Sequence, residues 1–275
     1  MRIRVSHSAV YRYATPAASV IQMLRLTPRN HDGQFVARWR IDVSTDCRLD
    51  QHEDAFGNIT HAFTAEGPLR ELTVLVEGEL ETRDTQGIVR GAVERFPPSL
   101  FLRETALTAV DDEIARFAAA AREEAGSDNL VVLHLLLDRL HACVTLDADG
   151  ADPLTTPASK TFAEKRGAST DLTHVFLAAA RSLGIPARYV GGYVRGDFGI
   201  HAHAPHGWAE AFVDGLGWVA FDVANGSCAA DAHVRVAIGL DLLGAAPARG
   251  SRYGGGEETV AVRVQVEQAA QQGQN

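Results

Sequence analysis

The chain has 275 residues, of which 46% are hydrophobic and 22% are charged, a composition typical of globular proteins. These proportions exclude collagen-like, coiled-coil and wholly disordered chains. The 3 cysteines are scattered and form no CxxC pair, which argues against a disulfide scaffold or a cysteine zinc site. The chain has a formal net charge of -9 and therefore lacks the positive field that binds the phosphate backbone of nucleic acids. We expect no nucleic-acid partner.

The first five residues, Met1-Arg2-Ile3-Arg4-Val5, alternate between apolar and basic side chains after the initial methionine. A secretory signal peptide needs a continuous apolar run, so none is predicted. No other stretch approaches the ~20 apolar residues that span a bilayer. We therefore expect a cytoplasmic location and no membrane partner.

The first 83 residues have the pattern of short β-strands separated by turns. Apolar and polar residues alternate over residues 2–13, with a bend expected at His7-Ser8, and again over residues 20–26, 35–43, 58–63 and 69–80. Short strands at this spacing predict an antiparallel sandwich or barrel. Because no nucleophiles, bases or ligands gather here, we interpret residues 1–90 as a β-rich N-terminal domain with a structural or recognition role.

Residues 91–268 are predicted to form a second domain. After a connection that contains Pro97-Pro98, helices are expected at residues 111–124 and 128–143, then a loop over residues 147–158. Apolar spacing predicts a third helix at residues 170–183, which Gly184 and Pro186 end. Strand-like runs follow at residues 187–195, 207–213, 217–223, 234–240 and 259–266. The predicted fold class is α+β, with helices packed on an antiparallel sheet, and residues 269–275 are expected to be a disordered tail.

Ser169, His206 and Asp222 have the residue types and the order of a nucleophile, a base and the group that orients the base. Ser169 precedes the third helix, whose amino terminus favours negative charge on a nucleophile or an oxyanion. His206 and Asp222 fall at the beginning and near the end of two strands that a short turn connects. Pairing of these strands would bring both side chains to one end of the sheet, which makes the three residues a candidate triad.

The sequence around each candidate residue resembles the core motif of bacterial transglutaminase-like proteins. The resemblance is carried by residues 165–193 around Ser169, by residues 206–212 around His206 and by residues 217–222 ending at Asp222, and it continues through residues 225–226 and 233–239. Residues 23–28 and 54–58 resemble the β-rich domain that precedes such cores. The resemblance implies a papain-like Cys-His-Asp fold, in which His206 is the base and Asp222 is its orienting residue.

Ser169 stands where the family carries its nucleophilic cysteine, and Cys47, Cys143 and Cys228 lie outside the motif. A cysteine beside histidine at a helix amino terminus can be held as a thiolate, whereas a serine must lose its proton during attack. Three interpretations are open: an engineered Cys→Ser substitution, a natural serine nucleophile, or a natural pseudoenzyme that binds its ligand without turnover. Taken alone, Ser169 is also a good helix N-cap, worth ~1 kcal/mol.

His201, His203 and His206 allow a second interpretation, a metal-dependent hydrolase. Strand alternation would place His201 and His203 on one face, but no carboxylate follows at a recognisable ligand spacing, and the triad already explains His206. We therefore expect no metal and no cofactor; calcium is not indicated, because no loop shows alternating oxygen ligands. In the third helix, Asp171 is expected to support the amino terminus, and His174 to pack or hydrogen-bond rather than react.

The predicted function is acyl transfer on peptide or side-chain amides, with a peptide or protein as substrate. The acyl-enzyme formed at residue 169 would be resolved by water, as in a protease or amidase, or by an amine, as in cross-linking. We favour hydrolysis because water needs no second substrate pocket. Turnover is expected to be impaired because residue 169 is serine. The alternative is a catalytically inactive homologue that acts as a peptide-binding module; the oligomeric state is not predicted.

Overall fold

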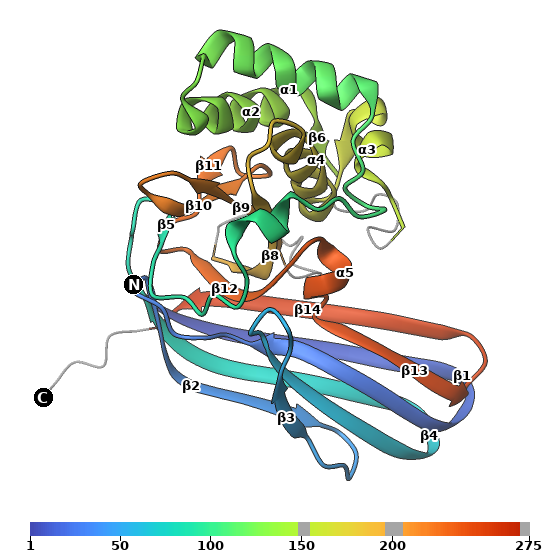
Figure 1. Ribbon diagram of the computed structural model, residues 1–275. Helices are drawn as coiled ribbons and strands as arrows, with labels where there is room; N and C mark the ends of the chain where they lie inside the picture. Colours follow the sequence, from blue (N-terminus) through green and yellow to red (C-terminus); the bar gives the residue numbers. More distant parts are fainter. Residues whose placement is uncertain (148–154, 196–205, 270–275) are drawn as a thin grey trace, which may run out of the picture.

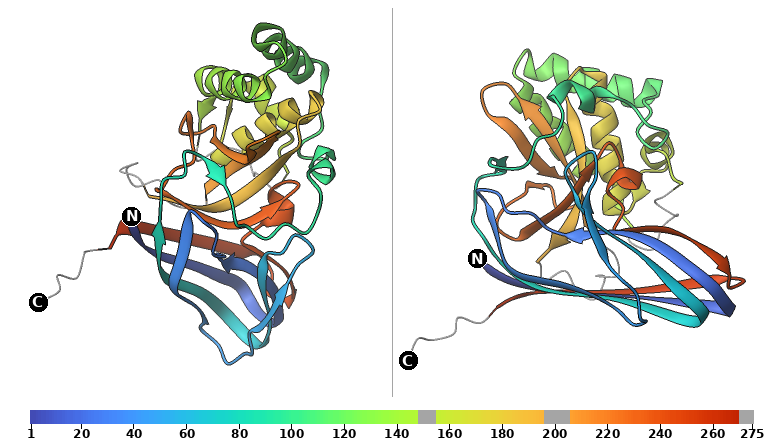
Figure 2. Two further views of the ribbon diagram at one scale, coloured as in Figure 1. Left: turned by 60° about the vertical axis from the view of Figure 1, so that its left-hand side comes forward. Right: turned by 60° about the horizontal axis from the view of Figure 1, so that its bottom comes forward.

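The computed structural model describes residues 1–147, 155–195 and 206–269. A long curved sheet forms one layer, and a second sheet with its helices lies over it (Figure 1 and Figure 2). The long sheet contains β1 (Arg2–Thr27), β2 (Gln34–Val43), β3 (Asp50–Glu53), β4 (Ile59–Thr82), β13 (Ala248–Gly254) and β14 (Glu258–Gln268). Its main order is β13-β1-β4-β2, with β14 also paired to β1 and β3 to β4.

Within the described residues, the amino-terminal strands β1 to β4 belong to one six-stranded sheet instead of the expected sandwich or barrel. The runs expected at residues 2–13 and 20–26 belong to the single strand β1, and those at residues 58–63 and 69–80 belong to β4. The bend expected at His7-Ser8 was wrong, because β1 pairs regularly with β14 from Ile3 to Tyr13. Residues at the opposite end of the sequence provide this pairing, so the local pattern could not show it.

The last two strands return to the amino-terminal sheet. In β14, Val266 pairs with Val5 of β1, and in β13, Ala248 pairs with Leu24 of the same strand. The run at residues 259–266 was expected in the second domain, but it extends the first sheet. The expected tail begins at Ala269, and residues 270–275 lie outside the described part of the chain.

The second sheet has the order β11-β10-β9-β8-β12, and neighbouring strands in it are antiparallel. These strands are β8 (Ala187–Val194), β9 (His206–Val213), β10 (Gly217–Asp222), β11 (Ser227–Cys228) and β12 (His233–Gly239), and β5 (Ile88–Val89) pairs with β10. Its helices are α1 (Asp112–Ala125), α2 (Asn129–Cys143), α3 (Ala158–Glu164) and α4 (Ser169–Ser182). Smaller elements are η1 (Pro98–Leu102), α5 (Leu242–Ala245) and the parallel pair β6 (Thr145–Leu146) and β7 (Arg166–Gly167). This arrangement confirms the α+β fold class.

The three long helices lie within two residues of their predicted bounds because local side chains set their ends. Asp111 caps α1 by accepting from Ile114 N–H, and Asp128 caps α2 in the same way. Gly184 has a φ of 73°, a conformation that few other residues adopt, and it ends α4. α4 packs on β8 and β9 and is buried on almost every side. In contrast, α3, α5 and β13 were not predicted. No helix in the described ranges combines the length and the hydropathy needed to cross a membrane.

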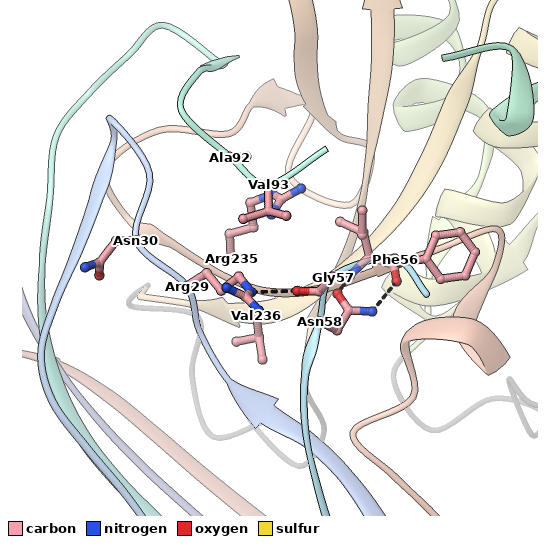
Figure 3. Close-up of a pocket in the computed structure, with 10 residues that line it drawn as sticks. Arg29, Asn30, Phe56, Gly57, Asn58, Ala92, Val93, Arg235 and Val236 are labelled. Atoms are coloured by element: carbon pink, nitrogen blue, oxygen red, sulfur yellow. Dashed lines mark hydrogen bonds between the residues drawn. The ribbon is translucent and has the colours of Figure 1, made fainter. Parts of the chain in front are cut away.

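Two buried amide side chains hold β12 of the core to the amino-terminal region. Asn58 Nδ2 donates to the carbonyl oxygen of Ile238 at 2.8 Å, and Ile238 N–H donates to Asn58 Oδ1 at 2.8 Å. Gln34 makes the same two bonds with Arg235, at 2.9 and 2.8 Å. Figure 3 shows Asn58 at the edge of a pocket of about 10 Å³, which has room for a single water at most. The long sheet is therefore fixed against the core by directional bonds.

Apolar packing also joins the two layers. Ile3, Val5 and Leu80 of the long sheet belong to the same buried cluster as side chains of α1, α2 and α4. A second buried cluster, which includes Leu24 and Phe63, lies within the long sheet. The first cluster therefore spans both layers, so packing sets the position of the long sheet relative to the candidate site.

Candidate active site

His206 and Asp222 meet at one edge of the core sheet. β9 begins at His206 and the antiparallel β10 ends at Asp222, so the hairpin brings both to the same end. His206 Nε2 lies 2.7 Å from Asp222 Oδ2. Because a carboxylate only accepts, the proton of the neutral imidazole is assigned to Nε2, and the lone pair of Nδ1 is left to accept a second proton.

Asp222 is fully buried and also accepts hydrogen bonds from His233 and Asn225. His233 Nε2 lies 2.9 Å and Asn225 Nδ2 lies 2.6 Å from Oδ2, and Asn225 N–H donates to Oδ1 at 3.3 Å. Burial by itself would raise the pKa of Asp222, but the charges and hydrogen bonds of His206 and His233 outweigh it and hold this pKa well below its usual range. Asp222 is therefore a carboxylate at neutral pH.

His233 is fixed through both of its ring nitrogens. Ala230 N–H donates to Nδ1 at 3.1 Å, so the proton of the neutral ring is assigned to Nε2, which faces Asp222. Trp208 packs against both imidazoles, with ring centroids 6.2 Å from His206 and 5.3 Å from His233. Packing and hydrogen bonding together hold His206 and Asp222 in one arrangement.

Ser169 is the first residue of α4 and lies next to the start of β9. Gly207 N–H donates to Ser169 Oγ at 3.4 Å, which places the hydroxyl beside the residue that follows His206. The interpretation of Ser169 as the helix N-cap was wrong, because Ala168 occupies that position. Asp171 Oδ2 accepts from Ala168 N–H at 2.9 Å and so supports the helix amino terminus, as predicted.

Close packing around β9 requires glycine after His206. A Cβ at Gly207 would lie 2.3 Å from Tyr189 Oη, so a larger residue would displace the buried Tyr189 ring. Tyr189 packs in turn against His174, with ring centroids 5.5 Å apart. His174 Nε2 accepts from Leu242 N–H at 3.1 Å, and burial lowers the pKa of His174 to about 4. His174 therefore packs and hydrogen-bonds, as predicted.

The histidines of the metal interpretation are not all described. His201 and His203 lie outside the described residues, and His206 is bonded to Asp222. Among the residues that are described, no three His, Cys, Asp or Glu side chains are grouped in a way that could hold a metal ion. Because two of the three histidines lie outside the described residues, the expectation that they hold no metal stays a prediction.

Asn225 and His233 had no predicted role in the site. The available signal was that the resemblance continues through residues 225–226 and 233–239. β12, which begins at His233, pairs with β8 and has no pairing with β10. Only the order of strands in the sheet therefore shows that His233 reaches Asp222.

The arrangement has the parts of a nucleophilic acyl-transfer site. A hydroxyl at a helix amino terminus lies beside the backbone of Gly207, which directly follows a histidine whose Nε2 is held by a buried carboxylate. The helix amino terminus offers N–H groups and a partial positive charge to an oxyanion. These are the groups that attack on an amide carbonyl needs.

Comparison with other proteins adds to this geometry. Residues 3–81 match the bacterial transglutaminase-like N-terminal region, and residues 117–223 match the transglutaminase-like superfamily. An uncharacterized protein of Mycobacterium leprae is 27% identical over 98% of this chain and 99% of its own length. An uncharacterized protein of Mycobacterium tuberculosis is 24% identical over 94% of this chain and 90% of its own length.

A solved structure shares the fold along the whole chain. It is the crystal structure of a candidate cysteine protease from Cytophaga hutchinsonii, with a TM-score of 0.76 and 17% identity. The match covers 100% of this chain and 92% of that one, so the long sheet and the core occur together in both. The chain is therefore similar to the bacterial transglutaminase-like N-terminal region over residues 3–81 and to the transglutaminase-like superfamily over residues 117–223.

Proposed function

We propose that this fold is built for acyl transfer on peptide or side-chain amides, with residue 169 as nucleophile, His206 as base and Asp222 as the group that orients the base. The observation that carries the proposal is the 2.7 Å contact between His206 Nε2 and Asp222 Oδ2, next to a helix that begins at residue 169. The contact leaves His206 Nδ1 to accept the proton of the nucleophile.

In the proposed reaction, the side chain of residue 169 attacks the carbonyl carbon while His206 Nδ1 takes its proton. The carbonyl oxygen becomes an oxyanion, which the N–H groups at the start of α4, including that of residue 169, stabilise. The C–N bond then breaks, and His206 returns the proton to the departing amine. Water attacks the acyl-enzyme in the second half, with His206 again as base, and releases a carboxylic acid and residue 169.

Ser169 is the weak part of this site. A cysteine at the same position would gain from the helix amino terminus and from His206, which together lower a thiol pKa from ~8.5 to ~3.5–7.5 in such settings. A serine hydroxyl is much less acidic and gains little from either. We expect this chain to turn over slowly or not at all, and the Ser169→Cys variant to be the active form.

The test is alkylation of Ser169→Cys by iodoacetamide near neutral pH, followed by peptide mapping so that Cys47, Cys143 and Cys228 are counted separately. We expect residue 169 to react at least tenfold faster than the exposed Cys143. The matched control is Ser182→Cys, which places the same change at the opposite end of α4, where the helix field disfavours a thiolate. Equal rates at positions 169 and 182 would refute the activated nucleophile.

Amide turnover is measured on the same variants with casein as substrate. Release of new amino groups by Ser169→Cys, and its loss in Ser169→Cys with His206→Ala, would support hydrolysis. Ser169→Cys could instead be alkylated fast at residue 169, release no amino groups and incorporate a primary amine such as monodansylcadaverine. In that case the proposed reaction would be cross-linking and not hydrolysis. Absence of both reactions would favour the peptide-binding alternative.

A further inference from the structure

A cavity of about 230 Å³ lies between the long sheet and the core, beside the candidate active site. Thr170, which follows Ser169, and His206 both line it. α5 packs against β8 and β12 and lies between the two layers, and its residues form one side of the cavity (Figure 1). The cavity therefore opens next to the position where the amide carbonyl would be attacked.

The amino-terminal sheet forms the floor of this cavity. Val262 of β14 and Val74 of β4 both pair with Ala9 of β1, so the three residues form one row across three strands. All three line the cavity, and so do His7 and Tyr11, which share a face of β1 with Ala9. The small Ala9 stands between two valines, and this leaves space in the middle of the row.

The roof comes from the core and also lacks bulk at its centre. Gly191 of β8 lines the cavity together with the larger side chains of Tyr189 and His206. A Cβ at Gly191 would meet nothing closer than 3.5 Å, so glycine is not required here by close packing. Small residues on both surfaces, Ala9 below and Gly191 above, keep the cavity open.

The chemistry of the lining selects an uncharged, apolar group. No Asp, Glu, Lys or Arg is among the described residues that line the cavity. His7 is bonded to Tyr193 Oη at 2.9 Å, and burial lowers the pKa of His7 to about 4, so this ring is neutral at pH 7. A charged side chain would lose its hydration here and gain no partner.

One polar atom in the lining is unpaired. Thr170 is only 7% exposed, and its Oγ1 has no hydrogen-bond partner among the described residues. A buried hydroxyl without a partner costs free energy, and a substrate amide in the cavity could provide the missing bond. The hydroxyl therefore gives the apolar cavity a single point at which it could hold a peptide group.

We infer that this cavity is a substrate subsite that takes one apolar side chain of leucine to phenylalanine size, with the amino-terminal sheet as its floor. The inference rests on the proposed acyl-transfer function of Ser169, His206 and Asp222. An apolar protein cavity of ~150 Å³ holds benzene, so a cavity of about 230 Å³ accommodates an aromatic ring. The role of the long sheet is then substrate recognition, in addition to structure.

Binding to the chain as it stands, with Ser169, tests the subsite without any turnover. The probes are N-acetyl-phenylalaninamide, N-acetyl-leucinamide and N-acetyl-glycinamide, and their dissociation constants are measured by NMR titration. Burial of the side chain should make the first two bind about ten- to a hundredfold more tightly than the glycine probe. Ala9→Leu fills the floor and should abolish this preference.

The matched control is Ala261→Leu, which makes the same change at an exposed position of β14, next to Val262, and should leave the preference intact. If Ala9→Leu fails to fold, Gly191→Ala narrows the cavity from the opposite side and should weaken the phenylalanine probe at least threefold. Equal binding of the three probes, or equal effects of Ala9→Leu and Ala261→Leu, would overturn the subsite.

The subsite and the catalytic proposal can fail separately. In one outcome, Ser169→Cys is inert, but the chain still prefers the phenylalanine probe and loses that preference on Ala9→Leu. This result would support the subsite and refute the proposed acyl transfer. In the opposite outcome, Ser169→Cys turns over amides at a rate that Ala9→Leu does not change, and the chain shows no preference among the probes. This result would overturn the subsite and leave the proposed acyl transfer intact.

Discussion

His233 Nε2 lies 2.9 Å from Oδ2 of Asp222, the same carboxylate oxygen that lies 2.7 Å from His206 Nε2. The candidate base therefore shares its orienting carboxylate with a second histidine. Ala230 N–H occupies Nδ1 of His233, so this ring is assigned as a donor to Asp222 and is not arranged to take a proton from the nucleophile. We interpret His233 as a residue that positions Asp222.

Loss of the His233 bond should slow the chemistry without abolishing it. In the Ser169→Cys background, we expect His233→Leu to reduce the rate of iodoacetamide alkylation at residue 169 about tenfold, because a hydrogen bond to a charged group contributes ~1.5–3 kcal/mol. His233→Gln places an amide N–H near the position of Nε2 and should restore most of the rate. Equal loss in the leucine and glutamine variants, with unchanged thermal unfolding, would argue against a positioning role.

Removal of the Asn58 side chain should weaken the attachment of β12 to the amino-terminal region. Asn58→Ala leaves the N–H and the carbonyl group of Ile238 buried without partners. Each unpaired group costs ~1–3 kcal/mol, so we expect the free energy of unfolding to fall by about 2 kcal/mol or more in urea titrations. The control is Asn30→Ala. It removes an exposed hydrogen bond from Val36 N–H that water can replace, so the free energy of unfolding should fall by less than about 1 kcal/mol.

Glu210 should be among the most sensitive charged residues of the core. It is fully buried and lies 2.7 Å from the buried Arg188 and 2.6 Å from Arg235. Burial by itself would raise the pKa of Glu210, but the two guanidinium groups outweigh it and lower this pKa to about 2. Arg188 also pairs with the more exposed Glu94, but Glu210→Gln removes the buried charge that both guanidinium groups share, and the free energy of unfolding should fall by ~3–5 kcal/mol.

The control for Glu210 is Glu71→Gln, which breaks an ion pair with Arg12 in which both side chains are half or more exposed. Water and salt screen such a pair, so the expected loss is below ~1 kcal/mol. The free energy of unfolding of both variants is measured in urea at pH 7. Comparable losses at the two positions would show that burial of the Arg188–Glu210–Arg235 group is not the cause of the destabilisation.

Stability should decline on mild acidification because His7 and His174 are buried in neutral form and burial lowers the pKa of His31 to about 4 as well. Burial lowers the pKa of His7 and of His174 to about 4, whereas an unfolded histidine titrates near ~6.5. Between these values the unfolded chain binds more protons than the folded one, so the free energy of unfolding falls as the pH falls. The expected slope is up to ~1.4 kcal/mol per pH unit for each histidine.

His7→Asn tests this slope, because its amide oxygen can still accept from Tyr193 Oη but does not titrate. Between pH 6.5 and 5.5 we expect the variant to lose about 1 kcal/mol less free energy of unfolding than the parent chain. His52→Asn changes an exposed histidine in the same way and should keep the parent slope. An identical slope in all three proteins would contradict a neutral, buried His7.

Features whose signals are local were predictable from the sequence. Asp111 and Asp128 cap helices through their own side chains, and Gly184 ends α4 through its own φ. The turn between β9 and β10 spans three residues, so the approach of His206 to Asp222 also followed from nearby residues. Each of these features depends on a few consecutive residues, which the sequence specifies directly.

Other features depend on residues that are distant in the sequence, and only the tertiary structure decided them. β14 pairs with β1, so the strand at residues 259–266 belongs to the first sheet. His233 reaches Asp222 because β12 lies beside β8, and Ala9 lines a cavity with His206 because α5 and the long sheet pack on the core. The sequence by itself determined the three long helices, the α+β class and the three candidate residues. The tertiary structure decided what surrounds them, because strand pairing and layer packing join residues that no local pattern connects.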